Sequence, residues 1–341
     1  ERHPEEDGID LIHYASAQGI NILDCWMPDP KSRDIIGKGI KDNRRQWYIQ
    51  GHIGSTWKDE QYFRTRDMKY VRPAFEDLLR RLQTDYIDLG MIHYVDSEKE
   101  WEQMQHSDYL GYVMELKNSG VIRHIGMSSH TPRVVERALD LGILDLLMFS
   151  INPGYDYHHG NYAIGSAEER MALYRRCQAE GVGISVMKAF SGGQLLDAKT
   201  SPFGQALTEY QCIQYALDKP GVLTVLPGVR GRKDLERVLG FLEASPEERD
   251  YSVLGTFTPK DAAGACVYCN HCQPCPAGLD VGLINKYYDL AQAGDPLAKD
   301  HYDQLEKKAG DCIQCGHCDR RCPFHVVQTG RMKEIQAYFG R

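Results

Sequence analysis

Eight of the eleven cysteines lie in two short runs near the end of the 341-residue chain. The first run reads Cys-x-x-Cys-x-x-Cys-x-x-Cys-Pro, and the second reads Cys-x-x-Cys-x-x-Cys-x-x-x-Cys-Pro. In proteins with this spacing, three close thiolates hold one 4Fe–4S cluster and the fourth cysteine reaches a second cluster. The spacing therefore predicts two 4Fe–4S clusters and a role in electron transfer. We assign Cys266, Cys269, Cys272 and Cys322 to one cluster, and Cys312, Cys315, Cys318 and Cys275 to the other.

Two other uses of these cysteines agree less well with the pattern. A structural zinc site takes four ligands around one ion, not a run of four cysteines followed by proline. A disulfide framework needs an oxidising compartment, and the N-terminal residues do not resemble a signal peptide. One departure is that only two residues separate Cys272 from Cys275, where the second run has three at the equivalent place. This difference would strain or weaken the ligation of the second cluster by Cys275.

Composition excludes several classes of protein. The formal net charge is −8 and the basic residues are dispersed, which argues against nucleic-acid binding. No apolar stretch approaches about 18 residues, so we expect no membrane span. Because thiolate-bound clusters need reducing conditions, we expect a cytoplasmic protein from an anaerobic or microaerobic host.

Up to about residue 243, short apolar runs alternate with amphipathic helical patterns. The apolar runs are Ile20–Cys25, Trp47–Gly51, Tyr86–Ile92, His124–Ser128, Leu144–Ser150, Gly183–Met187 and Leu223–Leu226. The helical patterns are Glu6–Gln18, Arg33–Lys41, Met68–Gln83, Trp101–Asn118, Pro132–Leu141, Ala167–Ala179, Gln205–Leu217 and Lys233–Leu242. Repeated βα units of this length predict a parallel sheet.

Seven strands and eight helices predict an α/β fold, a (β/α)8 TIM barrel whose first strand is missing from this chain. A seven-stranded open sheet is the alternative. We expect the barrel over residues 1–243, a charged linker over 244–265, and a small α-helical ferredoxin-like iron–sulfur domain over 266–341. Within that domain, helical patterns cover Leu283–Ala309 and Arg331–Phe339.

Chemistry in such barrels takes place at the C-terminal ends of the strands. The polar residues expected there are Asp24, Asp29, His52, His93, Ser128, Ser129, His130, Asn152 and Lys188. Histidine exchanges protons readily near neutral pH, so His52 and His93 with Asp24 or Asp29 predict an acid–base site. Two histidines and a carboxylate also match a mononuclear metal site, although we favour the metal-free interpretation.

Candidate substrate residues follow later strands. Lys188 either pairs with Asp24 or binds an anionic substrate, and Asn152 and Tyr155 belong to an aromatic loop. That loop either lines a substrate pocket or packs on the cysteine-rich domain. The same two interpretations apply to the aromatic residues that follow the strand predicted at Trp47–Gly51, which are Trp57, Tyr62 and Phe63.

Four segments resemble the aldo-keto reductase family. They are Asn21-Ile-Leu-Asp24, Asp85-Tyr-Ile-Asp-Leu-Gly-Met-Ile-His93, Ile122-Arg-His-Ile-Gly-Met-Ser128 and Leu226-Pro-Gly228. Together with the cysteine runs, they make the chain similar to the branch of that family that is fused to a ferredoxin-like domain. The resemblance implies a (β/α)8 barrel that passes hydride from NADPH to a carbonyl group.

The resemblance also implies a catalytic tetrad of aspartate, tyrosine, lysine and histidine, in which the tyrosine donates the proton. Asp24 matches the aspartate and His93 matches the histidine. Asp29 stands where the tyrosine is expected, and His52 stands where the lysine is expected. A carboxylate does not replace a phenol whose pKa is about 10. The proton donor is therefore expected to be His52, His93 or a protonated Asp29.

The nucleotide-binding half of the family pattern is only partly present. Backbone groups of Ser191, Gly192 and Gly193 are candidates for the pyrophosphate, and Arg230 and Arg232 for a 2′-phosphate. An ordinary loop with a solvated basic helix start explains the same residues. The glutamate and asparagine that the resemblance implies for the adenosine are replaced by Lys233 and Val238, so NADP(H) binding is an open question.

Three functions follow from these observations. The first is an iron–sulfur oxidoreductase that passes electrons between an external carrier, such as ferredoxin or flavodoxin, and a small polar substrate in the barrel. His52 and His93 would move protons, and Asp24 and Asp29 would orient them. The second is an NADPH-dependent carbonyl reductase with His52 as substitute acid. The third is an electron-transfer subunit of a larger redox complex.

Overall fold

The computed structural model describes residues 5–157, 160, 162–256, 264, 266, 268, 272–292, 294–322 and 324–341. Contacts within the chain divide it into two compact units. Unit 1 holds residues 1–149 and 228–240, and unit 2 holds residues 150–227 and 241–341. No helix in the described ranges has both the length and the apolar character that crossing a membrane requires.

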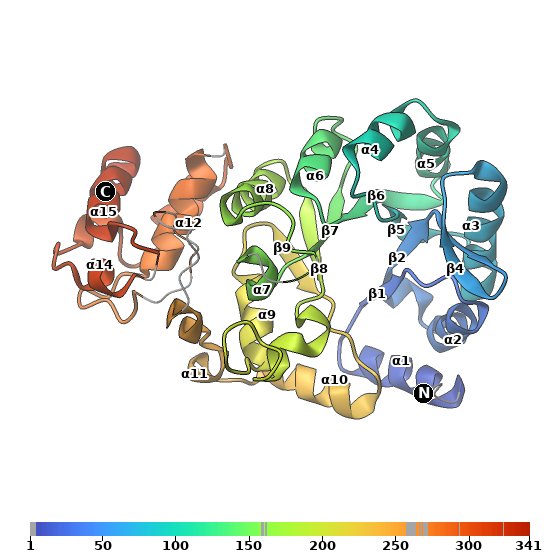
Figure 1. The fold of residues 1–341 in the computed structure, drawn as a ribbon, viewed down its shortest axis with the longest axis horizontal. Coiled ribbons are helices and arrows are strands. Elements are labelled where there is room, and N and C mark those ends of the chain that lie inside the picture. The colour runs from blue at the N-terminus through green and yellow to red at the C-terminus, as the bar shows by residue number, and fades with distance from the viewer. Residues whose placement is uncertain are drawn as a thin grey trace. The chain divides into compact units, whose positions relative to one another are not determined.

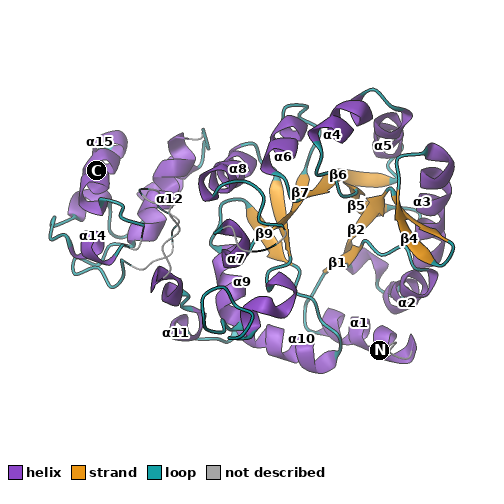
Figure 2. Ribbon diagram, viewed as in Figure 1, coloured by secondary structure: helices purple, strands orange, loops and turns teal. Residues whose placement is uncertain are grey.

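The described residues form a parallel sheet with the strand order β1-β2-β5-β6-β7-β8-β9 (Figure 2). The strands are β1 (Ile22–Cys25), β2 (Tyr48–Ile53), β5 (Ile87–Ile92), β6 (Ile122–Ser129), β7 (Leu146–Ser150), β8 (Gly183–Met187) and β9 (Val222–Val225). Each predicted strand is confirmed, with ends that differ by a few residues. The registers place Asp24 of β1 opposite Gln50 of β2, and His52 of β2 opposite Met91 of β5.

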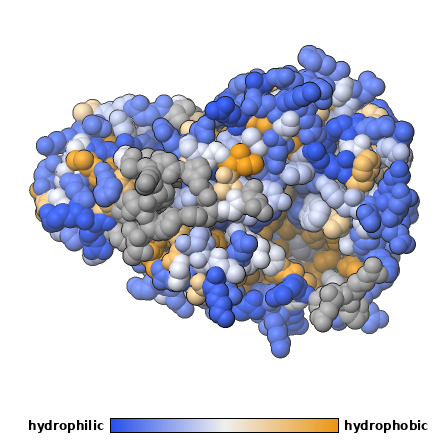
Figure 3. All heavy atoms as spheres, viewed as in Figure 1, coloured by the Kyte–Doolittle hydropathy of each residue, from blue (hydrophilic) through white to orange (hydrophobic). Residues whose placement is uncertain are grey.

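Helices surround the strands of unit 1 (Figure 1). They are α1 (Glu5–Ala17), α2 (Pro30–Ile40), α3 (Met68–Leu82), α4 (Glu98–Gln105), α5 (Asp108–Asn118), α6 (Pro132–Leu139) and α10 (Arg232–Leu239), with a 3₁₀ turn η1 (Arg44–Gln46). Helices α3, α5 and α6 contact those strands directly. Helix α3 buries Val71, Phe75, Leu78 and Leu82, the spacing of one apolar stripe. The surface over α3, α4 and α5 is mainly hydrophilic (Figure 3).

Two features of unit 1 differ from the sequence prediction. The helix expected over Trp101–Asn118 is two helices, because α4 ends at the C-cap His106 and α5 begins after the N-cap Ser107. An antiparallel hairpin, β3 (Ser55–Lys58) and β4 (Gln61–Arg64), forms where a loop was expected. Its turn residues Asp59 and Glu60 both have positive φ, 51° and 58°, as in a tight two-residue hairpin turn.

Unit 2 continues the α/β pattern and then forms the cysteine-rich region. Its helices are α7 (Pro153–Asp156), α8 (Ala167–Ala179), α9 (Glu209–Leu217), α11 (Pro246–Arg249), α12 (Val281–Gln292), α13 (Ala298–Asp303), α14 (His317–Arg321) and α15 (Gln328–Phe339). Its 3₁₀ segments are η2 (Ser191–Leu196), η3 (Gly240–Leu242), η4 (Ser252–Thr256) and η6 (Ala309–Asp311). Helices α12, α14 and α15 fall in the region predicted to be a small helical domain, whose exact boundaries stay a prediction.

The cysteine-rich region has its own apolar core. Cys272 and Cys318 pack there with the buried side chains of Leu279, Ile284, Tyr302, Met332, Ile335 and Phe339. The rings of Tyr302 and Phe339 are stacked, with centroids 4.0 Å apart. This core holds α12, α13 and α15 around the cysteines.

A buried ionic network holds the α/β part of unit 2. Asp156 accepts hydrogen bonds on one carboxylate oxygen from Arg170 Nε at 2.7 Å and Tyr174 Oη at 2.8 Å. Its other oxygen accepts a bond from Tyr215 Oη at 2.8 Å. Although burial alone would lower it, the neighbouring Tyr174 and Asp156 raise the pKa of Arg170, so this fully buried guanidinium keeps its charge. Asp156 is a carboxylate that pairs with that charge.

Candidate active site

Four side chains form a continuous hydrogen-bonded chain at the carboxyl ends of β1, β2 and β5. His52 Nε2 lies 2.9 Å from Asp24 Oδ1, and His52 Nδ1 lies 2.7 Å from His93 Nδ1. His93 Nε2 in turn lies 2.7 Å from the phenol oxygen of Tyr62. His52 and His93 are buried, and Asp24 is partly exposed. We call Asp24, His52, His93 and Tyr62 the relay.

The relay has one arrangement of protons in which every contact pairs a donor with an acceptor and both imidazoles are neutral. The phenol of Tyr62 donates to His93 Nε2, His93 Nδ1–H donates to His52 Nδ1, and His52 Nε2–H donates to the Asp24 carboxylate. In the opposite arrangement, a lone pair of a neutral His52 would face that carboxylate. The relay therefore connects a phenol to a carboxylate through two histidine rings, and all four ring nitrogens take part.

The surroundings favour the uncharged forms of His93 and Tyr62. Burial lowers the pKa of His93 well below its usual value, and His52, Arg66 and Arg64 lower it further. Burial raises the pKa of Tyr62, which Arg64 and Arg66 only partly oppose. Near neutral pH, His93 is thus a neutral imidazole and Tyr62 a protonated phenol, the forms that the arrangement above requires.

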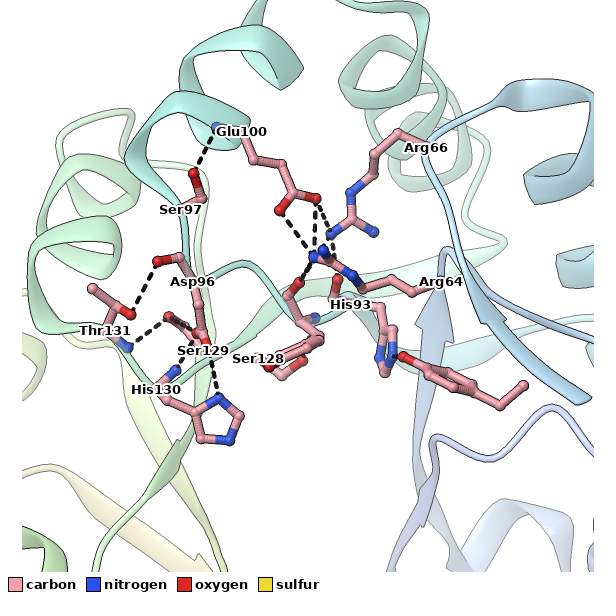
Figure 4. Close-up of polar contacts among 12 residues, drawn as sticks. Arg64, Arg66, His93, Asp96, Ser97, Glu100, Ser128, Ser129, His130 and Thr131 are labelled. Carbon is pink, nitrogen blue, oxygen red and sulfur yellow. Dashed lines mark hydrogen bonds and ion pairs between the residues drawn. The ribbon is translucent and has the colours of Figure 1, made fainter. Parts of the chain in front are cut away.

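The hairpin that carries Tyr62 is anchored next to His93. Arg64 donates to both carboxylate oxygens of Glu100 on α4, at 2.9 and 3.1 Å, and to the carbonyl of Tyr94 at 2.6 Å. Arg66 donates to the carbonyl of His93 and lies 3.1 Å from Glu100 (Figure 4). The ring of Trp26 meets that of Tyr62 edge to face, at 5.8 Å between centroids. These contacts hold β4 in the position in which the Tyr62 hydroxyl lies against His93.

A second acid–base pair lies at the ends of β5 and β6. Asp96 Oδ2 is 2.9 Å from His130 Nδ1, and its Oδ1 accepts bonds from the His130 backbone N–H at 2.6 Å and from Ser129 Oγ at 3.1 Å (Figure 4). Burial would raise the pKa of Asp96, but the bonds from His130 and Ser129 lower it overall. The ring of Tyr94 lies between this pair and the relay, 5.3 Å from the ring of His130 and 6.3 Å from that of His93.

Asp29 has a different local role from the other carboxylates. It is the N-cap of α2, and its Oδ2 accepts bonds from Ser32 N at 3.1 Å and Ser32 Oγ at 2.9 Å. A carboxylate at a helix N-cap satisfies backbone N–H groups and favours the start of the helix. The predicted catalytic role of Asp29 stays a prediction, whereas Asp24, His52 and His93 are brought together.

The lowered pKa of His93 predicts a dependence of stability on pH. In the unfolded chain this histidine titrates near pH 6.5, whereas in the folded protein it stays neutral to lower pH. Below about pH 6.5 the unfolded chain therefore binds one proton more than the folded protein. As the pH is lowered, the free energy of unfolding decreases by at most about 1.4 kcal/mol per pH unit. Urea unfolding of His93→Gln between pH 5 and 7 should show a smaller slope than the wild type. Equal slopes for His93→Gln and the wild type would contradict the prediction.

The predicted substrate residues of unit 2 lie together. Asn152 Nδ2 donates to the carbonyl of Lys188 at 2.9 Å, and Asn152 Oδ1 accepts from Tyr155 N at 2.9 Å, where it caps α7. The Lys188 ammonium lies 3.8 Å from the ring centre of Tyr162. Lys188 has a φ of 58°, which is rare for a residue with a side chain and is often found at functional sites.

The candidate nucleotide residues lie in two places. Ser191, Gly192 and Gly193 form a turn in unit 2 in which all three have positive φ; Gly192 is exposed, whereas Ser191 is buried. Arg230 and Arg232 of unit 1 border a cavity of about 450 Å³ at the start of α10, together with Asp7 and Asp10 of α1. Arg232 also lies 4.0 Å above the ring of Tyr14.

Most of the predicted cluster ligands can be placed. Cys275, Cys312, Cys315 and Cys318, which we assign to one cluster, border one cavity with Cys272. Its other walls are largely apolar, with Leu279, Val281 and Met332. A set of thiolates around an apolar cavity suits an iron–sulfur cluster. Of the first cluster's ligands, Cys266, Cys272 and Cys322 are described, and Cys269 lies outside the described residues.

Two family models match this sequence. The model described as the aldo/keto reductase family matches residues 1–209, more than half of the chain. The chain belongs to the aldo/keto reductase family. The model described as a 4Fe-4S dicluster domain matches residues 262–326. The predicted resemblance to aldo-keto reductases with a ferredoxin-like domain is therefore confirmed, whereas the number of clusters stays a prediction.

Curated relatives agree with this assignment. The aldo-keto reductase YhdN of Bacillus subtilis (strain 168) is 33% identical over 129 residues, 37% of this chain and 38% of that protein. Protein tas of Escherichia coli (strain K12) is 27% identical over 197 residues, 49% of this chain and 57% of that protein. The present chain thus matches only about two to three fifths of these relatives' length.

Solved structures confirm the fold of this aldo/keto reductase. Aldo-keto reductase AKR11C1 from Bacillus halodurans (holo form) superposes with a TM-score of 0.59 at 23% identity, covering 72% of this chain and 86% of that one. The glycerol dehydrogenase AKR11B4 from Gluconobacter oxydans also gives a TM-score of 0.59, at 18% identity, covering 76% and 89%. At such identities the likeness shows the fold alone.

Sequence reasoning missed the phenol of this family member. Tyr62 had been placed in a loop, either at a pocket or packed on the cysteine-rich domain, and the structure places it on β4 against His93. The available signal was the pair of short alternating segments around Asp59-Glu60, which lacks the glycine that marks most tight hairpins. Asp96 was also not singled out, although its neighbour His130 had been counted among the polar strand-end residues.

Proposed function

We propose that this aldo/keto reductase is an iron–sulfur oxidoreductase that interconverts a small polar carbonyl compound and its alcohol. The balanced reaction is R₂C=O + 2 e⁻ + 2 H⁺ ⇌ R₂CHOH, with electrons exchanged one at a time with an external carrier of the ferredoxin or flavodoxin class. The observation that carries the proposal is the relay of Asp24, His52, His93 and Tyr62, on a chain that also holds a 4Fe-4S dicluster domain.

The relay supplies the proton at the substrate oxygen. In the reducing direction, Tyr62 donates its phenolic proton to the developing alkoxide. For this direction the relay starts from the reverse tautomers, with a proton that the partly exposed Asp24 has taken from solvent. Tyr62 regains a proton from His93 Nε2, His93 Nδ1 takes the proton on His52 Nδ1, and His52 Nε2 takes the proton on Asp24. In the oxidising direction every proton moves the other way, and the proton from the alcohol finally reaches Asp24. A positioned acid or base of this kind accelerates proton transfer typically by about 10²- to 10⁴-fold.

One-electron chemistry also requires a proton at carbon. A hydride donor delivers both electrons with the hydrogen nucleus, whereas single electrons arrive without one. Two proton donors are therefore needed in the cluster-dependent reaction. His130, oriented by Asp96, is our candidate for the second donor, because a carboxylate bound to one ring nitrogen of a histidine orients the ring and stabilises its charged form.

When bound, the 4Fe–4S clusters supply one-electron transfer. The thiolates of Cys275, Cys312, Cys315 and Cys318 would hold one of them, at the cavity that they border. Cys266, Cys269, Cys272 and Cys322 would hold the other. The apolar walls around Cys275, Cys312, Cys315 and Cys318 limit access of water to the cluster that they would hold. Access of water is one of the factors that set a cluster's reduction potential.

A second candidate, an NADPH-dependent carbonyl reductase, is favoured by Tyr62. The phenol that the family pattern appeared to have lost is present on the hairpin, so hydride transfer with Tyr62 as proton donor is chemically complete. The positive-φ turn at Ser191–Gly193 and the cavity beside Arg230 and Arg232 are the candidate nucleotide contacts. Hydride transfer from NADPH does not need a second proton donor. Loss of His130 should therefore slow the cluster-dependent reaction but not the NADPH-dependent one.

An anaerobic reduction experiment tests the proposal. We expect dithionite, or a reduced flavodoxin, to bleach the visible absorption of the purified protein and to produce a reduced-cluster EPR signal. Adding glyceraldehyde, glycolaldehyde or dihydroxyacetone should then reoxidise the clusters and yield the alcohol. In D₂O, the alcohol should carry deuterium at the former carbonyl carbon. Cys315→Ala should lose one cluster signal and most of this turnover.

Three outcomes would contradict the proposal. Full turnover by Cys315→Ala would remove the electron relay. Alcohol whose new C–H hydrogen comes from labelled NADPH instead of solvent would establish the second candidate. Clusters that reduce normally but are not reoxidised by any of the three carbonyl compounds would remove the proposed substrate class.

A further inference from the structure

A buried glutamine donates a hydrogen bond to a cysteine of the first run. Gln328, the first residue of α15, is 2% exposed, and its Nε2 lies 3.7 Å from Cys266 Sγ. Cys266 is one of the residues that we assign to the first cluster. Hydrogen bonds to ligand sulfurs are among the factors by which a protein sets a cluster's reduction potential, because they stabilise the more negative, reduced state.

The orientation of the Gln328 amide is fixed by its neighbour on α12. Asn285 Nδ2 donates to Gln328 Oε1 at 2.9 Å, so the oxygen end of the amide is occupied and the NH₂ end faces the sulfur. Asn285 Nδ2 also donates to the carbonyl of Val281 at 2.7 Å, and Asn285 Oδ1 accepts from Arg331 Nε. Asn285 is fully buried, which leaves it little freedom to turn.

The same chain of bonds continues to the α/β part of unit 2. Arg331 pairs with one oxygen of Asp289, and the other oxygen accepts from Tyr268 Oη at 2.6 Å and from Arg175 at 3.3 Å. Arg175 Nε also donates to Tyr268 Oη at 3.0 Å. Arg175 belongs to α8, which flanks the substrate loop residues at its start, whereas Cys266 belongs to the cysteine-rich region. A continuous network thus joins α8 to a cluster ligand.

We infer that Gln328 raises the reduction potential of the cluster bound by Cys266, and that the network through Asn285, Arg331 and Asp289 to Arg175 holds it in place. Gln328 is in this sense a tuning residue and Arg175 a positioning residue. The inference deepens the proposed function, since it concerns the electron supply to the same reaction. It requires only that Cys266 ligates a cluster, and it needs no substrate to be tested.

The experiment is a potentiometric titration of the anaerobically purified full-length protein, followed by EPR. Gln328→Met keeps the size of the side chain and removes the donor, so we expect the midpoint potential of one cluster to move to lower values and that of the other to stay unchanged. A shift equivalent to a tenfold change in the reduction equilibrium would be about 59 mV for a one-electron couple. Iron content should match the wild type.

A matched variant tests the other cluster. Gln314 Nε2 lies 3.4 Å from Cys312 Sγ, but this glutamine is exposed. Gln314→Met should therefore move the other EPR signal, and by less, because water replaces the lost donor. An unchanged potential for both clusters in Gln328→Met with full iron content would overturn the inference, as would a shift to higher values.

Arg175→Met tests the network at its far end, where the guanidinium donates to Tyr268 and Asp289 and its charge acts on Cys266. We expect a shift in the same direction and of the same cluster as in Gln328→Met, but smaller. This variant also decides the matter if Gln328→Met fails to assemble its clusters, because an unshifted Arg175→Met would remove the link to α8. A failure of the proposed function would appear differently, as clusters with the expected potentials that no carbonyl compound reoxidises.

Discussion

Replacing Tyr62 by phenylalanine should lower turnover by about 10²- to 10⁴-fold while the clusters assemble and are reduced as in the wild type. The substitution removes only the hydroxyl that lies 2.7 Å from His93 Nε2 and leaves the ring that packs against Trp26. The measurement is the rate at which a carbonyl compound reoxidises the dithionite-reduced protein. Tyr48→Phe, at an exposed tyrosine at the opposite end of β2, is the matched control and should keep full activity.

The relay also predicts how two substitutions combine. His52→Gln interrupts the path between His93 and Asp24, and by itself it should cost a factor similar to that of Tyr62→Phe. Because groups that act as one unit give non-additive effects, the double variant should be scarcely slower than either single one. Effects that multiply would indicate that Tyr62 and His52 act independently. A fully active Tyr62→Phe would place the proton donor elsewhere.

Replacing Asp156 by alanine should destabilise the protein by about 3–5 kcal/mol, the cost of leaving one partner of a buried ion pair uncompensated. Arg170 would keep a fully buried charge, and the phenols of Tyr174 and Tyr215 would lose their acceptor. Thermal unfolding followed by circular dichroism should show a midpoint lowered by roughly 6–20 °C.

An exposed ion pair of the same unit supplies the control. Arg176 and Glu180 pair at 2.7 Å near the end of α8, with side chains 32% and 41% exposed. Glu180→Ala should change stability by only about 0.3–0.5 kcal/mol, as is usual for a pair at this spacing on a helix surface. Similar losses in both variants would mean that the Asp156 network contributes no more than a surface pair.

The alternation of strands and helices could be predicted from the sequence, because each strand is a short apolar run and each helix has an apolar stripe at helical spacing. Helix α3 is an example, since Val71, Phe75, Leu78 and Leu82 face the sheet at helical spacing. The break between α4 and α5 could not be predicted, because the apolar pattern continues across it. Ser107 Oγ donates to the carbonyl of Met104 and makes no capping bond to α5.

Three of the four relay residues followed from one rule. Parallel strands end at the same edge of a sheet, so Asp24, His52 and His93 could be expected to meet. Tyr62 could not, because a hairpin that pairs only with itself carries it back over the strand ends, and its turn has no glycine. Asp29, five residues beyond Asp24, starts a helix and its side chain caps that helix, a local role that the sequence prediction did not include.

The placing of the phenol on the β3–β4 hairpin has a consequence for what temperature does to this protein. A two-stranded hairpin is marginally stable alone, and this one depends on the ion pairs that Arg64 and Arg66 make with Glu100. Segments of this kind open locally at a free-energy cost well below that of unfolding the whole chain. In the proposed function, a molecule whose hairpin has opened lacks its proton donor. On warming, we expect a rising fraction of molecules with an open hairpin, so that activity is lost at temperatures at which the parallel sheet is still intact.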